Sequence, residues 1–286
     1  MSYLILGGTG TVGSSVVAEL AERGESLRVV TRSPEKVEDL PGDPEPVEAD
    51  MTDPTSFEGK FEGSDALFLL NPVSPTELEE GLFALEEAKR AGMDHIVYLS
   101  VQNVEQGHDM PHFASKIAIE NAIKKSGVDY TILQPSNYFQ NDYWFRDAIL
   151  EHGVYPQPIG SVGVSRVDVR DIAEAAANAL QDASHRNRTY AVVGPDPLTG
   201  EDCARIWGEA LDRDVTYGGD DLEAWEEQAR QGMPAWMTYD FRLMYAMFQD
   251  EGLAATEAQT EETRTILDGE PRSFLDFTAE VAGEWL

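Results

Sequence analysis

The sequence has little cysteine, little positive charge and no long apolar run. Its single cysteine, Cys203, excludes an intrachain disulfide and argues against a metal site built from thiolates. No stretch approaches the roughly 18 consecutive apolar residues that a membrane-spanning helix needs, so we expect no membrane partner. The first residues enter an apolar segment without a basic leader. We therefore expect no signal peptide and a cytoplasmic location.

Basic side chains are scarce throughout the chain. The 286 residues carry 53 Asp and Glu against 21 Lys and Arg, which gives a formal net charge of −32. Residues 1–150 hold 26 acids and 11 bases, and residues 151–286 hold 27 and 10, so the excess is not confined to a tail. Because nucleic-acid phosphates are bound by basic surfaces, we expect no nucleic-acid partner.

The evenly spread acidic charge predicts adaptation to high salt. A surface of like charges repels itself in dilute buffer, whereas at molar salt the Debye length falls to ~3 Å and the repulsion is screened. We therefore expect the melting temperature to rise from dilute buffer to molar KCl in a thermal unfolding experiment. A flat or falling melting temperature over that range would contradict halophilic adaptation.

The most informative positive feature is a glycine-rich turn near the start of the chain. An apolar run, Ser2–Leu6, predicts a strand, and the spacing of Val12, Val16, Val17 and Leu20 predicts a helix just after the turn. The turn fits both G-x-G-x-x-G and G-x-x-G-x-x-G, because it has glycines at 7, 8, 10 and 13. Strand, turn and helix in this order are typical of a site for a dinucleotide pyrophosphate. Its predicted cofactor-binding residues are Gly7, Thr9, Gly10, Thr11, Val12 and Gly13.

Short apolar strands alternate with helical patterns through the first half of the chain. This alternation predicts an α/β fold, a Rossmann-type doubly wound parallel sheet with a smaller, mostly helical C-terminal lobe. We place the Rossmann domain at 1–155 and the substrate lobe at 156–286, packed on the first as one unit. The predicted strands after the first are 26–31, 45–49, 65–70, 95–100, 130–133, 163–167, 189–193 and 215–217, with helices at 76–92 and 112–126.

The residues after the second predicted strand indicate which dinucleotide binds. An NAD site usually places a carboxylate there to bind the ribose 2′-hydroxyl, but this chain has Thr31, then Arg32, then Lys36 one turn later. An arginine pairs with a 2′-phosphate, whereas a carboxylate would repel it. The sequence therefore predicts NADP(H) in preference to NAD(H). The alternative is that both cations are ordinary surface residues.

Several short segments occur in a set order along the chain: Gly7–Gly13, Val30–Pro34, Asp50, Val97–Ser100, Ile132–Asn141, Val167–Ala173 and Thr189–Pro195. In this order they resemble the NmrA-like family of atypical short-chain dehydrogenases/reductases. That family includes quinone and azo-dye reductases, triphenylmethane reductases and proteins that only sense dinucleotides. The resemblance therefore implies the fold and the cofactor more firmly than the substrate.

The resemblance also implies roles for residues beyond the glycine turn. Asp50, with the Met51 backbone, would meet the adenine amine, although an Asp before Thr52-Asp53-Pro54 also forms turns. Asn137 and Tyr138 would line the substrate side. The predicted cofactor-binding residues outside the turn are Arg32, Lys36, Asp50, Met51, Asn71, Pro72, Lys116, Pro135 and Asn137.

The predicted catalytic residues are Ser100, His112, Lys116 and Tyr138. Ordinary short-chain dehydrogenases use a serine after the fifth strand and Tyr-x-x-x-Lys on the next helix, but here His112 stands four residues before Lys116. His112 could supply a proton or could simply help to start the helix. His108 and His112 have H-x₃-H spacing without a third ligand in view, so we predict no metal site.

Together these features predict an NADPH-dependent reductase of a small quinone-like or aromatic acceptor. Such an acceptor takes a hydride without needing the missing tyrosine, since its anion is delocalised and can be protonated by water. The alternatives are a non-catalytic NAD(P)(H)-sensing regulator and, third, a sugar-nucleotide epimerase or dehydratase, which the missing tyrosine disfavours. The aromatic and methionine-rich stretch 233–248 predicts acceptor contacts, lobe core or a subunit interface, so a homodimer stays open.

Overall fold

The computed structural model describes residues 1–285, and the chain divides into two compact units. Unit 1 comprises residues 1–134, 169–191 and 266–268, and unit 2 comprises 135–168, 192–265 and the chain after 268. This division differs from the single boundary expected at residue 155. The reason is that the segment from Val169 to Ala191 returns to unit 1, where it supplies a helix and most of a strand.

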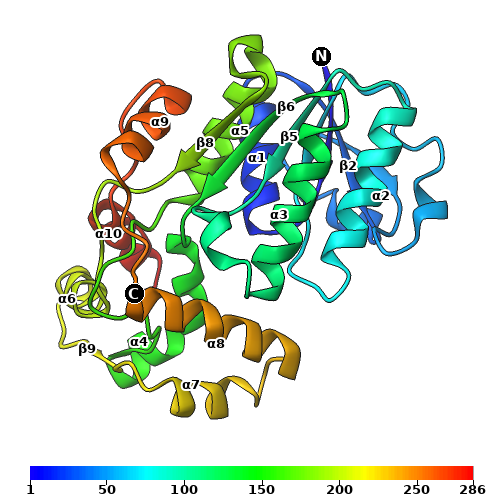
Figure 1. Cartoon of the computed structure of the whole chain (residues 1–286). Coiled ribbons are helices and arrows are strands. Elements are labelled where there is room, and N and C mark those ends of the chain that lie inside the picture. The colour runs from blue at the N-terminus through cyan, green and yellow to red at the C-terminus, as the bar shows by residue number, and fades with distance from the viewer. Residues whose placement is uncertain (286) are drawn as a thin grey trace. The chain divides into compact units, whose positions relative to one another are not determined.

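Unit 1 is built on a seven-stranded sheet with the strand order β3-β2-β1-β4-β5-β6-β8 (Figure 1). The pairs from β3 through β6 are all parallel. Because the chain continues from β1 to β2 on one side and returns to β4 on the other, the carboxyl ends of β1 and β4 form the topological switch point at which open α/β sheets place their ligands. The strands are β1 (Ser2–Leu6), β2 (Ser26–Thr31), β3 (Glu45–Glu48), β4 (Ala66–Leu69), β5 (His95–Leu99), β6 (Asp129–Pro135) and β8 (Arg188–Val192).

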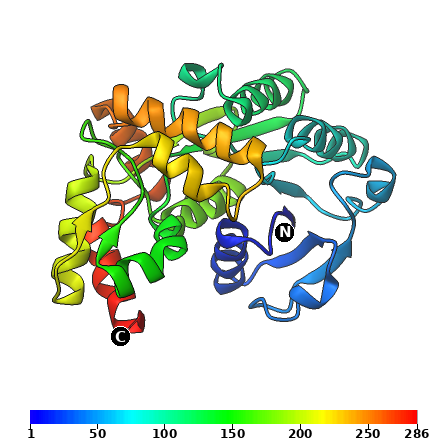
Figure 2. The same ribbon diagram turned by 90° about the horizontal axis from the view of Figure 1, so that it is seen from below.

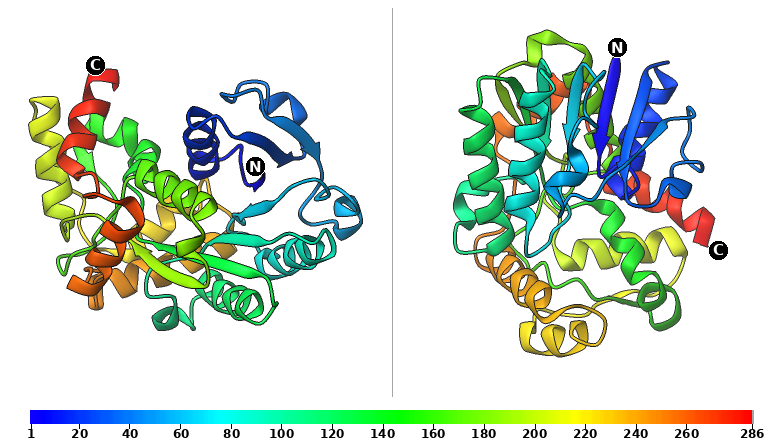
Figure 3. Two further views of the ribbon diagram at one scale, coloured as in Figure 1. Left: turned by 90° about the horizontal axis from the view of Figure 1, so that it is seen from above. Right: turned by 90° about the vertical axis from the view of Figure 1, so that its right-hand side faces the viewer.

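Helices cover both faces of this sheet, as the sequence predicts for a doubly wound fold (Figure 3). On one face α1 (Thr11–Glu22) packs against α5 (Val169–Gln181), and on the other α2 (Glu77–Arg90) packs against α3 (Pro111–Lys124). The alanines of α5 are buried, which lets the two helices approach closely. The 3₁₀ segments of unit 1 are η1 (Pro34–Lys36), η2 (Pro54–Phe57), η3 (Val104–Gly107) and η5 (Ala183–His185).

Unit 2 is mostly helical, which confirms the predicted character of the C-terminal part. Its core includes Trp207 stacked on Trp285 with ring centroids 4.5 Å apart. Figure 2 shows α7 and α8 side by side. No helix within residues 1–285 is long and apolar enough to cross a membrane. The remaining elements are η4 (Phe139–Phe145), α4 (Arg146–His152), β7 (Val154–Tyr155), α6 (Gly200–Leu211), β9 (Thr216–Tyr217), α7 (Leu222–Ala229), α8 (Ala235–Asp250), α9 (Glu257–Leu267) and α10 (Phe274–Trp285).

One strand prediction in this part of the chain is wrong, and one short strand was missed. The segment 163–167, predicted as a strand, forms only isolated bridges, because Gly163 has φ +112° and the backbone cannot continue as a regular strand. The two-residue strand β7 was not predicted. The stretch 233–248 largely forms α8. Tyr245 and Phe248 of this helix pack into the core of unit 2, in line with the lobe-core interpretation of the stretch.

A buried histidine makes the stability of unit 1 depend on pH. His95 begins β5, is 1% exposed, and its Nε2 lies 3.0 Å from Thr131 Oγ1. Burial, with a smaller contribution from Arg186, lowers the pKa of His95 from 6.5 to about 4. As the pH falls below 6.5, the unfolded chain takes up a proton that the folded protein does not accept, so stability is lost between pH 6.5 and about 4.

We therefore expect His95→Gln to flatten the acid side of the stability curve. At pH 5 the histidine costs about 2 kcal/mol relative to pH 7, and glutamine does not titrate. Urea unfolding at both pH values in molar KCl measures this difference. An identical loss of stability between pH 7 and pH 5 in both proteins would show that His95 is not the group responsible.

Candidate functional site

The glycine turn after β1 has the geometry that its sequence predicts. Gly7 has φ +75°, and a Cβ there would lie 2.9 Å from Leu70 O at the end of β4. A Cβ on Gly13 would lie only 2.1 Å from Gly7 O, and one on Gly8 would lie 2.7 Å from Val29 Cγ1. Gly10 differs, because its Cβ would meet nothing closer than 3.5 Å. Internal packing thus requires glycine at positions 7, 8 and 13, whereas the space beside the Cα of Gly10 is open.

The amino end of α1 is suited to binding an anion. Gly10 is the N-cap residue and provides no side-chain cap, and the first turn contains no acidic residue. Thr9, Gly10 and Thr11 are exposed, whereas Val12 and Gly13 are buried against the sheet. The first N–H groups of a helix lack intrahelical acceptors and carry the positive end of the helix dipole, which attracts a phosphate.

The carboxyl end of β2 contains no carboxylate. The Thr31 hydroxyl is engaged locally, accepting the Ser33 N–H at 3.1 Å. Arg32 and Lys36 are exposed, and neither forms an ion pair within the described residues. In a chain of charge −32, two unpaired cations at this position leave a local positive site next to the glycine turn of the neighbouring strand.

Asp50 follows β3 and organises a turn. Its Oδ1 accepts the backbone N–H of Thr52 at 3.0 Å and the Thr52 hydroxyl at 2.8 Å. The backbone hydrogen bond from Thr52 is the largest cause of the lowered pKa of Asp50, and the charge of Arg32 adds to it. Asp50 therefore forms the turn that its position before Thr52-Asp53-Pro54 suggested. Met51 is partly buried against the core of the sheet.

Asn71 is a buried polar residue at the carboxyl end of β4. It is 3% exposed, and neither atom of its side-chain amide has a hydrogen-bond partner among residues 1–285. Pro72 follows and prevents the strand from continuing. Because buried polar groups are nearly always hydrogen-bonded, an unpaired amide at the edge where such folds bind ligands makes Asn71 a candidate ligand-binding residue.

Lys116 is buried and paired with a residue that the sequence did not reveal. Its Nζ lies 2.9 Å from Glu77 Oε1, and the two side chains are 6% and 0% exposed. The ammonium also donates to Leu99 O at 3.4 Å, which fixes it at the carboxyl end of β5, and lies 5.7 Å from the centre of the Tyr98 ring. Burial, then the nearby acids Glu77 and Glu120, raise the pKa of Tyr98, so this phenol stays protonated.

The other two predicted catalytic residues of unit 1 are buried as well. Ser100 follows β5 and is 1% exposed, and its hydroxyl has no hydrogen-bond partner in the described part of the chain. His112 is the second residue of α3, after Pro111, and packs edge-on against Phe113 with ring centroids 4.7 Å apart. One helical turn separates it from Lys116. The histidine lies on the same face of the helix as the lysine.

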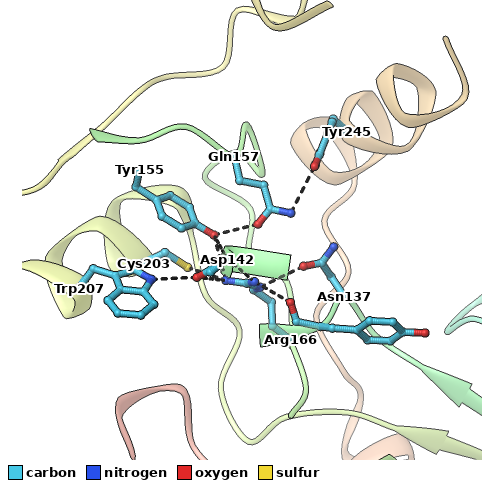
Figure 4. A network of polar contacts seen from close by, with 9 residues as sticks. Asn137, Asp142, Tyr155, Gln157, Arg166, Cys203, Trp207 and Tyr245 are labelled. Carbon is cyan, nitrogen blue, oxygen red and sulfur yellow. Dashed lines mark hydrogen bonds and ion pairs between the residues drawn. The ribbon is translucent and has the colours of Figure 1, made fainter. Parts of the chain in front are cut away.

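Unit 2 contains the remaining predicted residues. Pro135 ends β6, and Asn137 and Tyr138 follow it, both partly buried. A fully buried guanidinium, Arg166, binds this segment. Its Nε donates to Asn137 Oδ1 at 3.1 Å, and its Nη2 donates to Tyr138 O at 2.7 Å (Figure 4).

The charge of Arg166 is balanced by Asp142. Arg166 Nη2 lies 2.7 Å from Asp142 Oδ1, and both side chains are 0% exposed. Trp207 Nε1 donates to Asp142 Oδ2 at 2.8 Å, and the Tyr155 hydroxyl accepts from Arg166 Nη1 at 2.9 Å. Burial raises the pKa of the neighbouring Cys203 thiol to about 11, so it is not a reactive thiolate.

Sequence reasoning missed Glu77, Asp142 and Arg166. Glu77 lies in the first turn of a helix, where acidic residues are common, and its partner is distant in sequence. Arg166 gave one usable signal, since it is the only basic residue in the apolar segment 163–167.

Comparisons with known proteins agree with this geometry. The family model described as "NmrA-like family" matches residues 2–277 of this chain. The chain is 30% identical over 279 residues to an NAD(P)H azoreductase of Xenophilus azovorans, covering 96% of each chain. Two solved structures share the fold. One is an NADPH-dependent quinone oxidoreductase of Escherichia coli complexed with NADPH (TM-score 0.86, 21% identity, 98% of this chain and 99% of that one). The other is NmrA, a negative transcriptional regulator, in complex with NADP (TM-score 0.80, 17% identity, 99% and 95%).

The strand order and the glycine turn define a Rossmann-type α/β protein. Within that class, the match over nearly the whole chain shows that this chain belongs to the NmrA-like family.

Proposed function

We propose that this protein is an NADPH-dependent reductase of a small quinone-like or aromatic acceptor. The observation that carries the proposal is the local positive site of Arg32 and Lys36, which stands where an NAD site would have a carboxylate. The names of its relatives support a reductase, since one is an NAD(P)H azoreductase and a protein of the same fold is an NADPH-dependent quinone oxidoreductase.

The predicted cofactor-binding residues of unit 1 then have the following roles. The N–H groups of Thr11, Val12 and Gly13 bind the pyrophosphate, and the glycine turn allows its close approach. Asp50 and the Met51 backbone bind the adenine. The unpaired amide of Asn71, beside Pro72, binds ribose, and so does Lys116. The bound cofactor supplies the hydride.

Glu77 and the carbonyl oxygen of Leu99 together orient the buried ammonium of Lys116. Since Glu77 compensates the charge, the ammonium can remain in a buried site and still hold a hydroxyl. A quinol anion takes its proton from water or from His112. Where water is the donor, the protein's contribution is to bind and orient the acceptor. In unit 2, Asn137 and Tyr138 contribute contacts to the acceptor, and Pro135 and Asn137 contribute contacts to the cofactor.

Replacing Arg32 with alanine tests the choice of cofactor. We expect NADPH binding to weaken by about 1.5–3 kcal/mol, a typical charge-assisted hydrogen bond, and NADH binding to stay nearly unchanged. Fluorescence titration of both cofactors measures this. Arg188→Ala is the matched control, because it removes the same charge from another exposed position of unit 1. Equal losses for both cofactors would mean that Arg32 does not bind the 2′-phosphate.

The second candidate function is a dinucleotide-sensing regulator without turnover. It is favoured by His112 in the place of the usual tyrosine, and NmrA itself, a regulator, shares the fold. A sensor would change its conformation between NADPH and NADP⁺, which requires different affinities of two states for the two forms. The sugar-nucleotide epimerase or dehydratase remains the third hypothesis, disfavoured by the same missing tyrosine.

A further inference from the structure

The buried guanidinium of Arg166 determines which way the Asn137 amide points. A guanidinium has five N–H donors and no acceptor, so the side-chain atom that faces Arg166 Nε at 3.1 Å must be the amide oxygen. The amide nitrogen, Nδ2, therefore points away from Arg166, as Figure 4 shows. Within residues 1–285 this nitrogen has no hydrogen-bond partner, although Asn137 is only partly exposed.

The backbone around Asn137 is held as firmly as its side chain. Val167 N–H donates to Asn137 O at 2.9 Å, and Phe139 N–H donates to Val167 O at 2.8 Å. Arg166 adds the hydrogen bond to Tyr138 O and is itself fixed by Asp142. The Asn137 N–H groups are thus preorganised donors, whose orientation does not have to be established when a ligand binds.

We propose that Arg166 is a positioning residue that turns the Asn137 N–H outward, and that this N–H donates to a carbonyl oxygen of the acceptor. The inference rests on the proposed function and narrows it to acceptors that carry a conjugated carbonyl, of which quinones are the simplest. When a quinone is reduced, a hydride is transferred, NADPH is oxidised to NADP⁺, and the quinol anion takes one proton from water. The charge develops on the oxygen atoms, where an N–H donor stabilises it.

Asn137→Asp is the variant that isolates this donor. Aspartate is nearly the same size as asparagine and keeps an oxygen facing Arg166, so residues 137 and 138 stay bound to the guanidinium. Both N–H donors of the amide are lost. The matched control is Gln228→Glu, the same change from amide to carboxylate at an exposed position of α7 in unit 2. Thermal unfolding of both variants verifies that they are folded.

Binding can be measured without turnover by equilibrium dialysis against NADP⁺-loaded protein. The ligands are 1,4-naphthoquinone and naphthalene, which has the same rings without the carbonyls. We expect Asn137→Asp to weaken binding of the quinone about 10- to 100-fold, and to change the affinity for naphthalene by less than about twofold. Gln228→Glu should change the affinities for the quinone, naphthalene and NADPH by less than about twofold.

Two results would overturn the inference. Unchanged quinone binding, or equal weakening of quinone and naphthalene, would show that Asn137 does not bind a carbonyl. Weaker NADPH binding with unchanged quinone binding would assign the donor to the carboxamide carbonyl of the nicotinamide instead of the acceptor. A failure of the proposed function looks different, because quinone binding would then depend on Asn137 while NADPH is never oxidised.

Discussion

Asp142→Leu is expected to lower the free energy of unfolding by about 3–5 kcal/mol, because it leaves the buried guanidinium of Arg166 without its counter-ion. Both side chains are 0% exposed, so water cannot replace the lost carboxylate. The Trp207 indole N–H would lose its acceptor in the same variant. A loss of this size is a large part of the stability of a typical domain.

The control for Asp142 is Asp147→Leu in the same unit. Asp147 pairs with Arg146 across 3.4 Å, but these side chains are 80% and 47% exposed. Exposed ion pairs contribute about 0–1 kcal/mol, and both variants remove one negative charge from an acidic protein. Urea unfolding in molar KCl compares the two. Similar small losses would show that the Arg166–Asp142 pair does not stabilise unit 2.

The second large effect is expected in the glycine turn, where two glycines should respond differently to alanine. In Gly13→Ala the new Cβ would lie 2.1 Å from Gly7 O, so the turn and α1 must move apart. We expect this variant to be destabilised by about 3 kcal/mol or more, as in severe overpacking, and to lose measurable NADPH binding. Far-UV circular dichroism during urea unfolding and fluorescence titration with NADPH measure the two effects.

Gly10→Ala provides the contrast, because its Cβ would meet nothing closer than 3.5 Å within the protein. We expect it to fold with nearly unchanged stability and to bind NADPH at least about 10-fold more weakly, since the methyl group occupies the side where the pyrophosphate approaches. Normal NADPH affinity in Gly10→Ala would contradict the assignment of this turn to the dinucleotide.

Much of unit 1 could be predicted because its signals are local. The alternation of short apolar strands with helical patterns is confirmed by the sheet, and the helix expected from Val12 to Leu20 is α1. The glycine turn could be placed because its conformation depends on residues within one segment. The same is true of Thr31, which ends β2, and of Arg32, which follows it.

The parts that escaped prediction depend on contacts between distant residues. Nothing local indicates that Glu77 will be buried against Lys116, or that Arg166 will meet Asp142. The segment 163–167 looked like a strand because of Val164 and Val167, yet it starts at Gly163 with a positive φ and contains the buried Arg166. Burial of a charge is decided by tertiary structure, and sequence periodicity does not record it.

Anaerobic stopped-flow mixing of NADPH-loaded protein with a panel of quinones in molar KCl tests the central claim most directly. The proposed function predicts that bound NADPH is oxidised far faster than in buffer, and that excess NADPH supports repeated turnovers with one quinone reduced per NADPH. A rate equal to that of free NADPH across the whole panel would contradict a reductase. If hydrogen exchange then differed between the NADPH and NADP⁺ complexes, a dinucleotide sensor would replace it.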